Sequence, residues 1–214
     1  STLVVDNAST DGSLEIIRQE YPEVEVIALS ENTGFCHAVN VGIQASDSPY
    51  VLLLNNDTVT MPGFVAALLQ RMESDERIFS VSPMMLSLQD PSRIDDAGDR
   101  YNALGWAFAR GKGQPAERYT KPARIFAACG GASLYRREAV LSLGGFDENH
   151  FAYLEDIDIG YRALIQGWSN MYEPRARVLH AGSAVSGSRY NAFKVKLSSA
   201  NNAYMIGKNM PLLQ

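Results

Sequence analysis

The sequence has few cysteines, no long apolar run and no excess of basic residues, and each shortage excludes a class of protein. Cys36 and Cys129 are too few for a disulfide framework, and their small or apolar neighbours predict buried free thiols in a reducing compartment. No apolar stretch reaches the roughly 18 residues of a membrane-spanning helix. The formal net charge of −5 provides no broad basic field, so we expect no nucleic-acid partner.

A glycine-rich dinucleotide fingerprint is also missing, which argues against a nicotinamide-dependent enzyme. In its place, residues 6–12 (Asp-Asn-Ala-Ser-Thr-Asp-Gly) follow the first apolar run and open a predicted helix. Residues 32–35 form a second polar turn of this kind, before the helix predicted at 35–45. Since helix N-termini attract anions and polar ligands, both turns are candidate ligand loops.

Strand and helix signals alternate along the first part of the chain. Apolar runs predict strands at 3–5, 24–28, 50–54 and 78–84, separated by amphipathic helices. This rhythm predicts an α/β fold in which a mostly parallel central sheet has helices on both faces.

The rhythm is lost over residues 87–124, where glycine and proline recur among charged residues. We interpret them as an irregular insertion, with room for short antiparallel strands, inside a single domain that spans residues 1–214. Beyond it, the patterns predict a strand at 132–135, helices at 138–143 and 155–168, two short strands at 171–173 and 177–179, and a helix at 188–208.

The run from Tyr50 to Asp57 ends four apolar residues in Asn55, Asn56 and Asp57. Ligands of open α/β sheets bind beyond the carboxyl ends of the strands, where a carboxylate can hold a divalent cation and its diphosphate. A plain strand-to-loop turn explains the same residues equally well, because asparagine and aspartate favour turns.

Two further sites have both a structural and a functional interpretation. Glu155, Asp156 and Asp158 begin a predicted helix, where acids favour the positive end of the dipole, but a carboxylate there can also serve as a general base. His180 ends an apolar strand, and a lone histidine is more often a structural hydrogen-bonding group than a metal ligand.

Taken in order, six short motifs resemble the family 2 glycosyltransferases of the GT-A fold, in particular the rhamnosyltransferase-like group. They are residues 4–12, residues 32–35 with Asn40 and Gly42, residues 52–58, residues 144–148, residues 151–158 with Arg162, and residues 172–174 leading to 178–180. Each motif is weak alone, but their common order and spacing are specific and favour the functional interpretations above.

The resemblance implies a role for each site residue. Asp6, Ser9, Asn32 and Asn56 would bind the nucleotide sugar. Asp57, the last residue of a segment that replaces the usual D-x-D, would bind Mg²⁺ or Mn²⁺ together with His180. Asp156 would be the catalytic base, and Glu155 and Asp158 would position the helix or the acceptor.

The implied reaction is a metal-assisted single displacement that inverts the anomeric centre. The donor would be dTDP-rhamnose or a UDP-hexose, and the acceptor a glycan or lipid-linked glycan of a cell-surface polysaccharide. The resemblance also implies that this chain begins after the first strand and helix of the family. A non-catalytic nucleotide-sugar-binding module derived from such an enzyme is the alternative.

The implied location is the cytoplasm, with a peripheral contact at the inner membrane face as an option. Arg189, Lys194, Lys196 and Lys208 lie on the last predicted helix and can face anionic headgroups. An ordinary solvated helix face is the simpler interpretation of these four residues.

Overall fold

The structure is a computed structural model that describes residues 1–102, 104–182 and 192–210. Its elements in chain order are β1 (Leu3–Asp6), α1 (Ser13–Glu20), β2 (Glu25–Ala28), α2 (Phe35–Ala45), β3 (Tyr50–Leu54), β4 (Thr58–Thr60), α3 (Phe64–Glu73), β5 (Ile78–Ser87), β6 (Ile94–Asp96), β7 (Asp99–Tyr101), β8 (Ala107–Ala109), the 3₁₀ helix η1 (Ala116–Tyr119), β9 (Ala123–Ile125), β10 (Ala132–Arg136), α4 (Arg137–Ser142), α5 (Glu155–Ile165), β11 (Ser169–His180) and α6 (Ala192–Asn209).

The central sheet has the strand order β3-β10-β5-β11-β4, with β6 paired to β5 and β9 to β11. β5 lies in the middle, and nine of its ten residues are buried, the polar Ser80 and Ser82 among them. The expected α/β architecture is present, but the sheet is mixed and not mostly parallel. β5 and β11 are parallel, whereas β10 runs antiparallel between β3 and β5.

β11 also differs from the sequence-based expectation, because the two short strands predicted at 171–173 and 177–179 form one strand. Pro174 lies between the two predicted strands, and proline lacks the backbone N–H that a sheet ladder needs. In the structure the pairing of β11 with β5 instead shifts register between Glu173 and Arg177, and the strand continues to His180.

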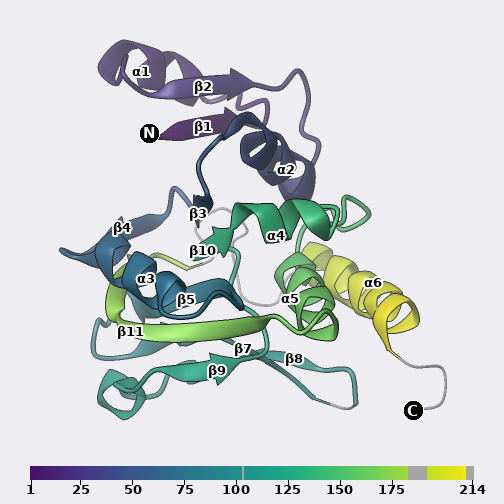
Figure 1. Ribbon diagram of the computed structural model, residues 1–214. Coiled ribbons are helices and arrows are strands. Elements are labelled where there is room, and N and C mark those ends of the chain that lie inside the picture. The colour runs from purple at the N-terminus through teal and green to yellow at the C-terminus, as the bar shows by residue number, and fades with distance from the viewer. Residues whose placement is uncertain (103, 183–191, 211–214) are drawn as a thin grey trace.

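Helices cover both faces of the central sheet, as predicted (Figure 1). On one face, α2, α4 and α5 pack over Phe79 and Tyr135. On the other face, α3 buries Leu68 and Met72 against Val81. Burial of this kind contributes about 25 cal/mol for each Å² of apolar surface removed from water.

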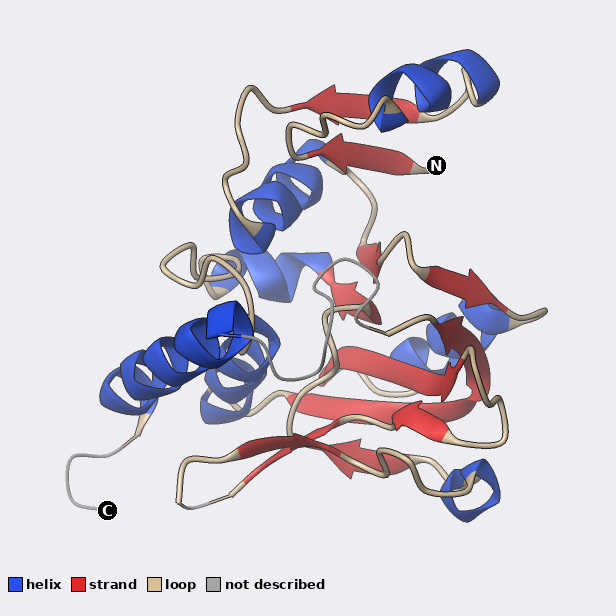
Figure 2. Ribbon diagram, turned by 180° about the vertical axis from the view of Figure 1, so that it is seen from behind, coloured by secondary structure: helices blue, strands red, loops and turns tan. Residues whose placement is uncertain are grey.

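β1 and β2 form a separate parallel pair, and β1 does not pair with β3. Both ribbon views place this pair with α1 at one end of the molecule and the β7–β8 hairpin at the other (Figures 1 and 2). The insertion at 87–124 contains the short antiparallel strands β6 to β9, as the sequence analysis allowed. In the described ranges, no helix has the length and apolar character needed to cross a membrane.

Candidate active site

Asp57 and His180 lie together although 123 positions separate them in the sequence. β4 starts at Thr58 and pairs antiparallel with the end of β11, so that Thr58 lies opposite His180. This pairing brings Nε2 of His180 to 3.3 Å from Oδ2 of Asp57. The tight turn before β4 is closed by the Thr58 hydroxyl, which donates to the Asn55 carbonyl at 2.6 Å.

The other ring nitrogen of His180 is held by a residue that the sequence analysis did not single out. Nδ1 lies 2.7 Å from Oδ2 of Asp95, and Lys112 forms an ion pair with the same carboxylate. The hydrogen bond to Asp95 raises the pKa of His180, and burial opposes it. A proton on Nδ1 shared with Asp95 leaves the Nε2 lone pair available to a cation bound beside Asp57, because a carboxylate in this position orients metal-binding histidines in proteins.

The residues around Asp57 fit a divalent cation. Oδ1 of Asp57 is buried without a hydrogen-bond partner among the described residues. A carboxylate oxygen and an imidazole nitrogen then face one point, a donor set that suits Mn²⁺ or Mg²⁺ when phosphate oxygens complete the shell.

Asp156 lies at the N-terminus of α5, and its carboxylate is fixed by backbone donors. Gly130 N–H donates to Oδ2 at 3.0 Å, and Ile157 N–H donates to Oδ1 at 2.8 Å. The neighbouring Gly131 carbonyl accepts the N–H of Asn55 at 2.8 Å. Two adjacent glycines therefore connect the end of β3, where the Asn-Asn-Asp segment begins, to the start of α5.

Burial raises the pKa of Asp156, and the two backbone donors oppose this effect. Burial and the negative charge of Asp156 raise the pKa of Glu155 to about 8, and Oε2 of Glu155 has no partner among the described residues. A ligand atom of Asp99, one of Cys129 and one of Asp156 lie within 4.8 Å of one another. Burial also raises the pKa of Asp99 well above its usual range.

The insertion thus contributes acids that the sequence analysis missed. Asp95 reaches His180, Asp99 lies beside Asp156, and burial raises the pKa of the intervening Asp96 to about 7. Three aspartates within five residues of an otherwise irregular segment were the available signal.

The backbone before Asp156 has a rare conformation. Tyr153 and Leu154 both have positive φ, 73° and 66°, which is uncommon for residues other than glycine. The amide of Asn201 on α6 donates to the Ala152 and Tyr153 carbonyls, each at 2.8 Å. Such strain persists only where the surroundings hold it, and it is frequent at functional sites.

Asp158, predicted as a supporting or acceptor residue, is fully buried and acts as an anchor. Arg162 Nε donates to Oδ2 at 2.8 Å, Asn209 donates to Oδ1 at 2.7 Å, and Lys208 lies 3.0 Å from Oδ1. These contacts fit the supporting role and fix α6 to α5. They also turn Lys208 away from the membrane contact considered above, while Arg189 lies outside the described residues.

The predicted nucleotide loops are joined to each other. Asp6 accepts the Ser9 N–H at 3.2 Å, and the amide of Asn7 bonds Asn32 at 3.2 Å. The sequence analysis did not single out Asn7. Asn56 is exposed, as a ligand-binding residue would be.

One contact connects these loops with the segment before Asp156. The N–H of Phe35, which follows Gly34, donates to the Phe151 carbonyl at 2.8 Å. A Cβ atom on Gly34 would lie 2.6 Å from that same carbonyl oxygen, and Gly34 has a φ of 83°. Only glycine fits at this approach of the two segments.

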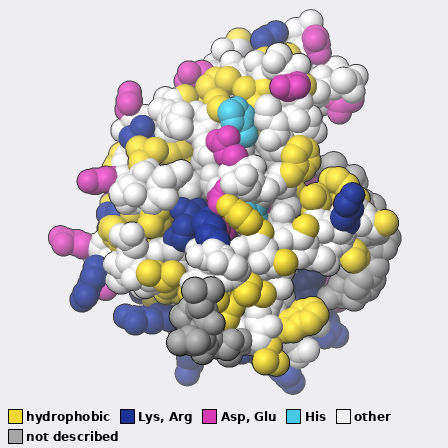
Figure 3. All heavy atoms as spheres, turned by 90° about the vertical axis from the view of Figure 1, so that its right-hand side faces the viewer, with side chains coloured by type: hydrophobic (Ala, Val, Ile, Leu, Met, Phe, Trp, Pro, Cys, Tyr) yellow, Lys and Arg dark blue, Asp and Glu magenta, His cyan; other side chains and the backbone are white. Residues whose placement is uncertain are grey.

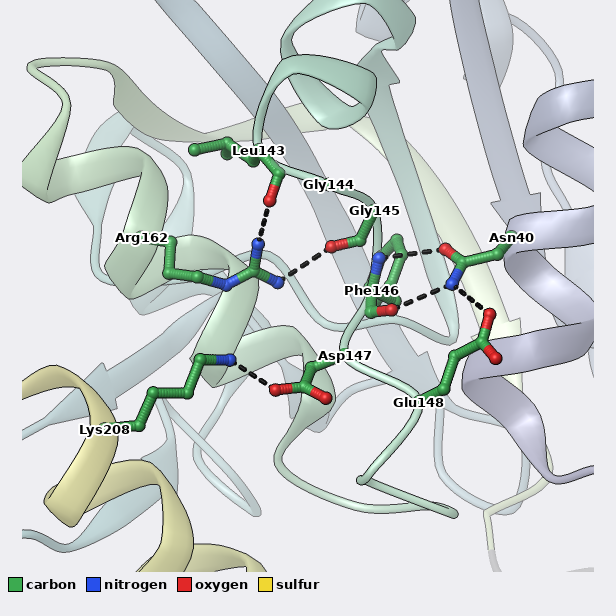
Figure 4. Close-up of a pocket in the computed structure, with 9 residues that line it drawn as sticks. All are labelled: Asn40, Leu143, Gly144, Gly145, Phe146, Asp147, Glu148, Arg162 and Lys208. Atoms are coloured by element: carbon green, nitrogen blue, oxygen red, sulfur yellow. Dashed lines mark hydrogen bonds and ion pairs between the residues drawn. The ribbon is translucent and has the colours of Figure 1, made fainter.

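A cavity of about 320 Å³ is lined by none of Asp57, Asp156 and His180 (Figure 4). It is lined by Asn40, Leu143, Gly144, Gly145, Phe146, Asp147, Glu148, Arg162 and Lys208. Arg162 donates to the Leu143 and Gly145 carbonyls, and Asn40 bonds the backbone of Phe146. Since the polar groups of this lining form hydrogen bonds with one another, we assign the motif at residues 144–148 a structural role.

Comparison with known sequences identifies relatives. The family model described as Glycosyl transferase family 2 matches residues 2–144. The N-acetylglucosaminyl-diphospho-decaprenol L-rhamnosyltransferase of Mycobacterium tuberculosis is 32% identical over 209 residues, which is 84% of this chain and 66% of that protein. The chain therefore spans slightly less than two thirds of the length of this relative. The poly-beta-1,6-N-acetyl-D-glucosamine synthase of Staphylococcus aureus is 22% identical over 177 residues, covering 81% of this chain and 41% of that protein.

Two solved structures share the fold. GalNAc-T7 with UDP, GalNAc and Mn²⁺ superposes with a TM-score of 0.74 at 18% identity, over 96% of this chain and 41% of that chain. The mannosyltransferase PcManGT from Pyrobaculum calidifontis, in complex with GDP-Man and Mn²⁺, superposes with a TM-score of 0.65 at 18% identity. The superposition covers 96% of this chain and 53% of that chain. These likenesses confirm the expected GT-A fold.

Proposed function

Because the chain belongs to glycosyl transferase family 2, we propose that it transfers a sugar from a nucleoside-diphosphate donor to a hydroxyl acceptor, with inversion at the anomeric carbon. The observation that carries this proposal is the contact between Asp57 and His180, with Asp156 connected to the same strand end through Gly130 and Gly131. A turn with no ligand has no need to leave a buried carboxylate oxygen unpaired beside an oriented imidazole.

Asp57 and His180 would hold the divalent cation, and Asp95 would keep the imidazole in the required tautomer. When bound, the cation acts as a Lewis acid that offsets the negative charge on the departing diphosphate. The unpartnered Oδ1 of Asp57 supports this assignment, since a buried acceptor is stabilised by a cation.

Asp156 would accept the proton of the acceptor hydroxyl. The hydroxyl oxygen bonds to the anomeric carbon while the bond from that carbon to the diphosphate oxygen breaks, and the proton passes to the carboxylate. A raised pKa makes Asp156 a stronger base, and the two N–H donors hold it in one orientation. Asp6, Ser9, Asn32 and Asn56 would bind the nucleotide sugar.

The substrates follow from the relatives only as proposals. The name of the mycobacterial relative gives a rhamnosyl donor and a diphospho-decaprenol acceptor. dTDP-rhamnose, with UDP-hexoses as the alternative, and a lipid-linked glycan are therefore our proposed donor and acceptor. A lipid-linked acceptor would place the protein at the inner membrane face, on the cytoplasmic side.

The test is to measure by calorimetry the affinity for a nucleoside diphosphate, with and without Mn²⁺. We expect Mn²⁺ to raise the affinity of the unmodified protein, and Asp57→Ala to abolish that increase. Asp47→Ala, which removes an exposed carboxylate elsewhere, is the matched control. If Asp57→Ala leaves the Mn²⁺ effect intact, this carboxylate is only part of a turn.

Measuring turnover distinguishes an enzyme from a non-catalytic binding module. Transfer to a lipid-linked acceptor that requires Asp156 supports the enzyme. Mn²⁺-dependent nucleotide binding without transfer, over the full panel of dTDP- and UDP-sugars and with both a lipid-linked and a free glycan acceptor, would favour the module.

A further inference from the structure

The β7–β8 hairpin carries large apolar side chains that nothing in the described structure covers. Leu104 is 82% exposed, Trp106 is 67% exposed and Phe108 is 47% exposed. They follow one another at every second position, at the far end of the molecule from β1 and β2 (Figure 1). An exposed apolar group of this kind marks an interaction surface more often than isolated exposed residues do.

The register of the hairpin separates its two faces. Tyr101 and Ala107 form one cross-strand pair, and the Tyr101 ring packs on Phe126, with ring centroids 5.2 Å apart. Arg100 and Phe108 form the neighbouring pair. Because successive strand residues point to opposite faces, Arg100, Trp106 and Phe108 share the outer face.

In the described part of the hairpin turn, four backbone N–H groups donate hydrogen bonds within the turn itself. Oδ1 of Asn102 accepts the N–H of Leu104 and that of Trp106, both at 3.0 Å. The Asn102 carbonyl accepts the N–H of Gly105 at 3.0 Å, and the Asn102 N–H donates to the Trp106 carbonyl. Entry into a medium without water would therefore leave none of these four donors unpaired, which lowers the cost of placing a loop there.

The hairpin is supported from behind by α6. Tyr101 Oη lies 3.4 Å from the side chain of Asn202. Gly105 has a φ of 82°, and a Cβ atom there would lie 2.6 Å from Cδ1 of Ile206. The apolar side chains are thus presented by a packed turn, seated against a helix.

The two segments next to this surface carry basic and no acidic residues, although β7 begins at Asp99. Residues 100–116 contain three basic residues and no acidic one, and residues 192–210 likewise contain three and none, in a chain with a net charge of −5. Arg110 donates to the Ala97 carbonyl and Lys112 pairs with Asp95, whereas Arg100 and Lys196 are exposed. Near the lower edge of the face in Figure 3, hydrophobic and basic side chains are visible and acidic ones are not.

We propose that the outer face of the β7–β8 hairpin, formed by Arg100, Leu104, Trp106 and Phe108, docks onto an anionic lipid surface. The inference rests on the membrane location proposed above and names the surface responsible. Tryptophan favours the headgroup region, and an adjacent arginine pairs with anionic headgroups. A convex turn needs no complementary groove in a bilayer, whereas a protein partner would have to provide one.

The experiment uses Trp106 as the reporter. The sequence has two tryptophans, so Trp168→Phe leaves Trp106 as the sole indole. We expect vesicles of phosphatidylcholine mixed with phosphatidylglycerol to shift its emission to shorter wavelength, and brominated phosphatidylcholine to quench it. Donor and Mn²⁺ are left out, so the measurement does not depend on sugar transfer.

Vesicle partition of matched variants identifies the contact. Leu104→Ser should weaken partition about tenfold or more, and Arg100→Gln about fivefold, the latter only on anionic vesicles. Ile16→Ser, at a 52% exposed apolar position on α1, should have no effect.

Three results would overturn the proposal. Vesicle binding with unchanged Trp106 emission would assign the membrane contact to another surface. Absence of vesicle binding would exclude the lipid partner, and nucleoside-diphosphate binding by the same sample would show that this failure does not arise from a damaged nucleotide site. A dimer that Leu104→Ser dissociates, together with unquenched Trp106, would assign the face to a second copy of the chain.

Discussion

Nδ1 of His180 lies 2.7 Å from Oδ2 of Asp95, a residue 85 positions earlier in the chain. The aspartate belongs to the irregular insertion and the histidine to the longest strand of the sheet. An aspartate so placed fixes both the ring orientation and the protonated nitrogen of the imidazole. Nε2, the other ring nitrogen of His180, lies 3.3 Å from Oδ2 of Asp57.

The first prediction concerns this pair. Asp95→Asn should weaken Mn²⁺ binding about 10- to 100-fold, the usual effect of losing a carboxylate that orients a metal-binding histidine. The signal of free Mn²⁺ in electron paramagnetic resonance measures this affinity directly. Asp90→Asn, an exposed aspartate of the same insertion, is the control. Equal affinities in the two variants would show that Asp95 does not position His180.

The second prediction concerns the base. Asp156→Asn should lower kcat about 10²- to 10⁴-fold, because the amide cannot accept the proton of the attacking hydroxyl. Nucleoside-diphosphate affinity should stay close to that of the unmodified protein, since Asp156 faces Gly130 and α5 and makes no contact with Asp57 in the described residues. Steady-state transfer assays and calorimetry measure the two quantities, with Asp47→Asn as control. A variant that keeps its turnover would remove Asp156 from the reaction.

The third prediction concerns pH and stability at Glu155. Its pKa is raised to about 8 in the folded protein from an ordinary value of 4.5. Between these two pH values the unfolded chain releases the proton and the folded protein retains it, so folding stability falls as pH rises through this window. Glu155→Gln lacks this loss, and its Tm should exceed that of the unmodified protein by about 5 °C near pH 9.

As a control, the Tm difference between Glu155→Gln and the unmodified protein should disappear at acidic pH. Below about pH 4.5 both folded and unfolded Glu155 carry the proton, so the two proteins should melt together. Glu20→Gln, at an exposed position of α1, should follow the unmodified protein throughout. A constant Tm difference between Glu155→Gln and the unmodified protein at all pH values would contradict the assignment.

The fourth prediction concerns Asn201 as a positioning residue. Asn201→Asp keeps the shape but removes the donors to the Ala152 and Tyr153 carbonyls, so the segment before Asp156 should loosen. We expect stability to fall by about 1–3 kcal/mol, with faster hydrogen exchange over residues 152–157 and a lower kcat. Ser199→Ala, on the exposed side of α6, is the comparison. Unchanged exchange in that segment would show that the two hydrogen bonds do not hold it.

Much of the fold follows from local pattern. The limits of α2 were predicted residue by residue, because Gly34 and Ser46 bound an apolar stripe of helical period. β3 was predicted with the same accuracy from its unbroken apolar run. Such signals are contained in neighbouring residues, so one sequence suffices to find them.

What the sequence analysis missed depends on distant pairing. The antiparallel entry of β10 between β3 and β5 follows from which strands meet, and no local period encodes that choice. Asp95 escaped notice for the same reason, because its partner lies in a strand far along the chain. Asp57, Asp156 and His180 were predicted as site residues because each matches a family motif at a strand end or helix start.

Two consecutive asparagines of α6 face in different directions. Asn201 donates to the two carbonyls that precede Asp156, the proposed base, and Asn202 contacts Tyr101 of the β7–β8 hairpin. Helix α6 thus links the exposed apolar side chains of the β7–β8 hairpin to the segment that precedes Asp156. If the hairpin docks on a membrane as we propose, α6 would hold Asp156 at a fixed distance from that membrane, and a lipid-linked acceptor would have to extend over that distance.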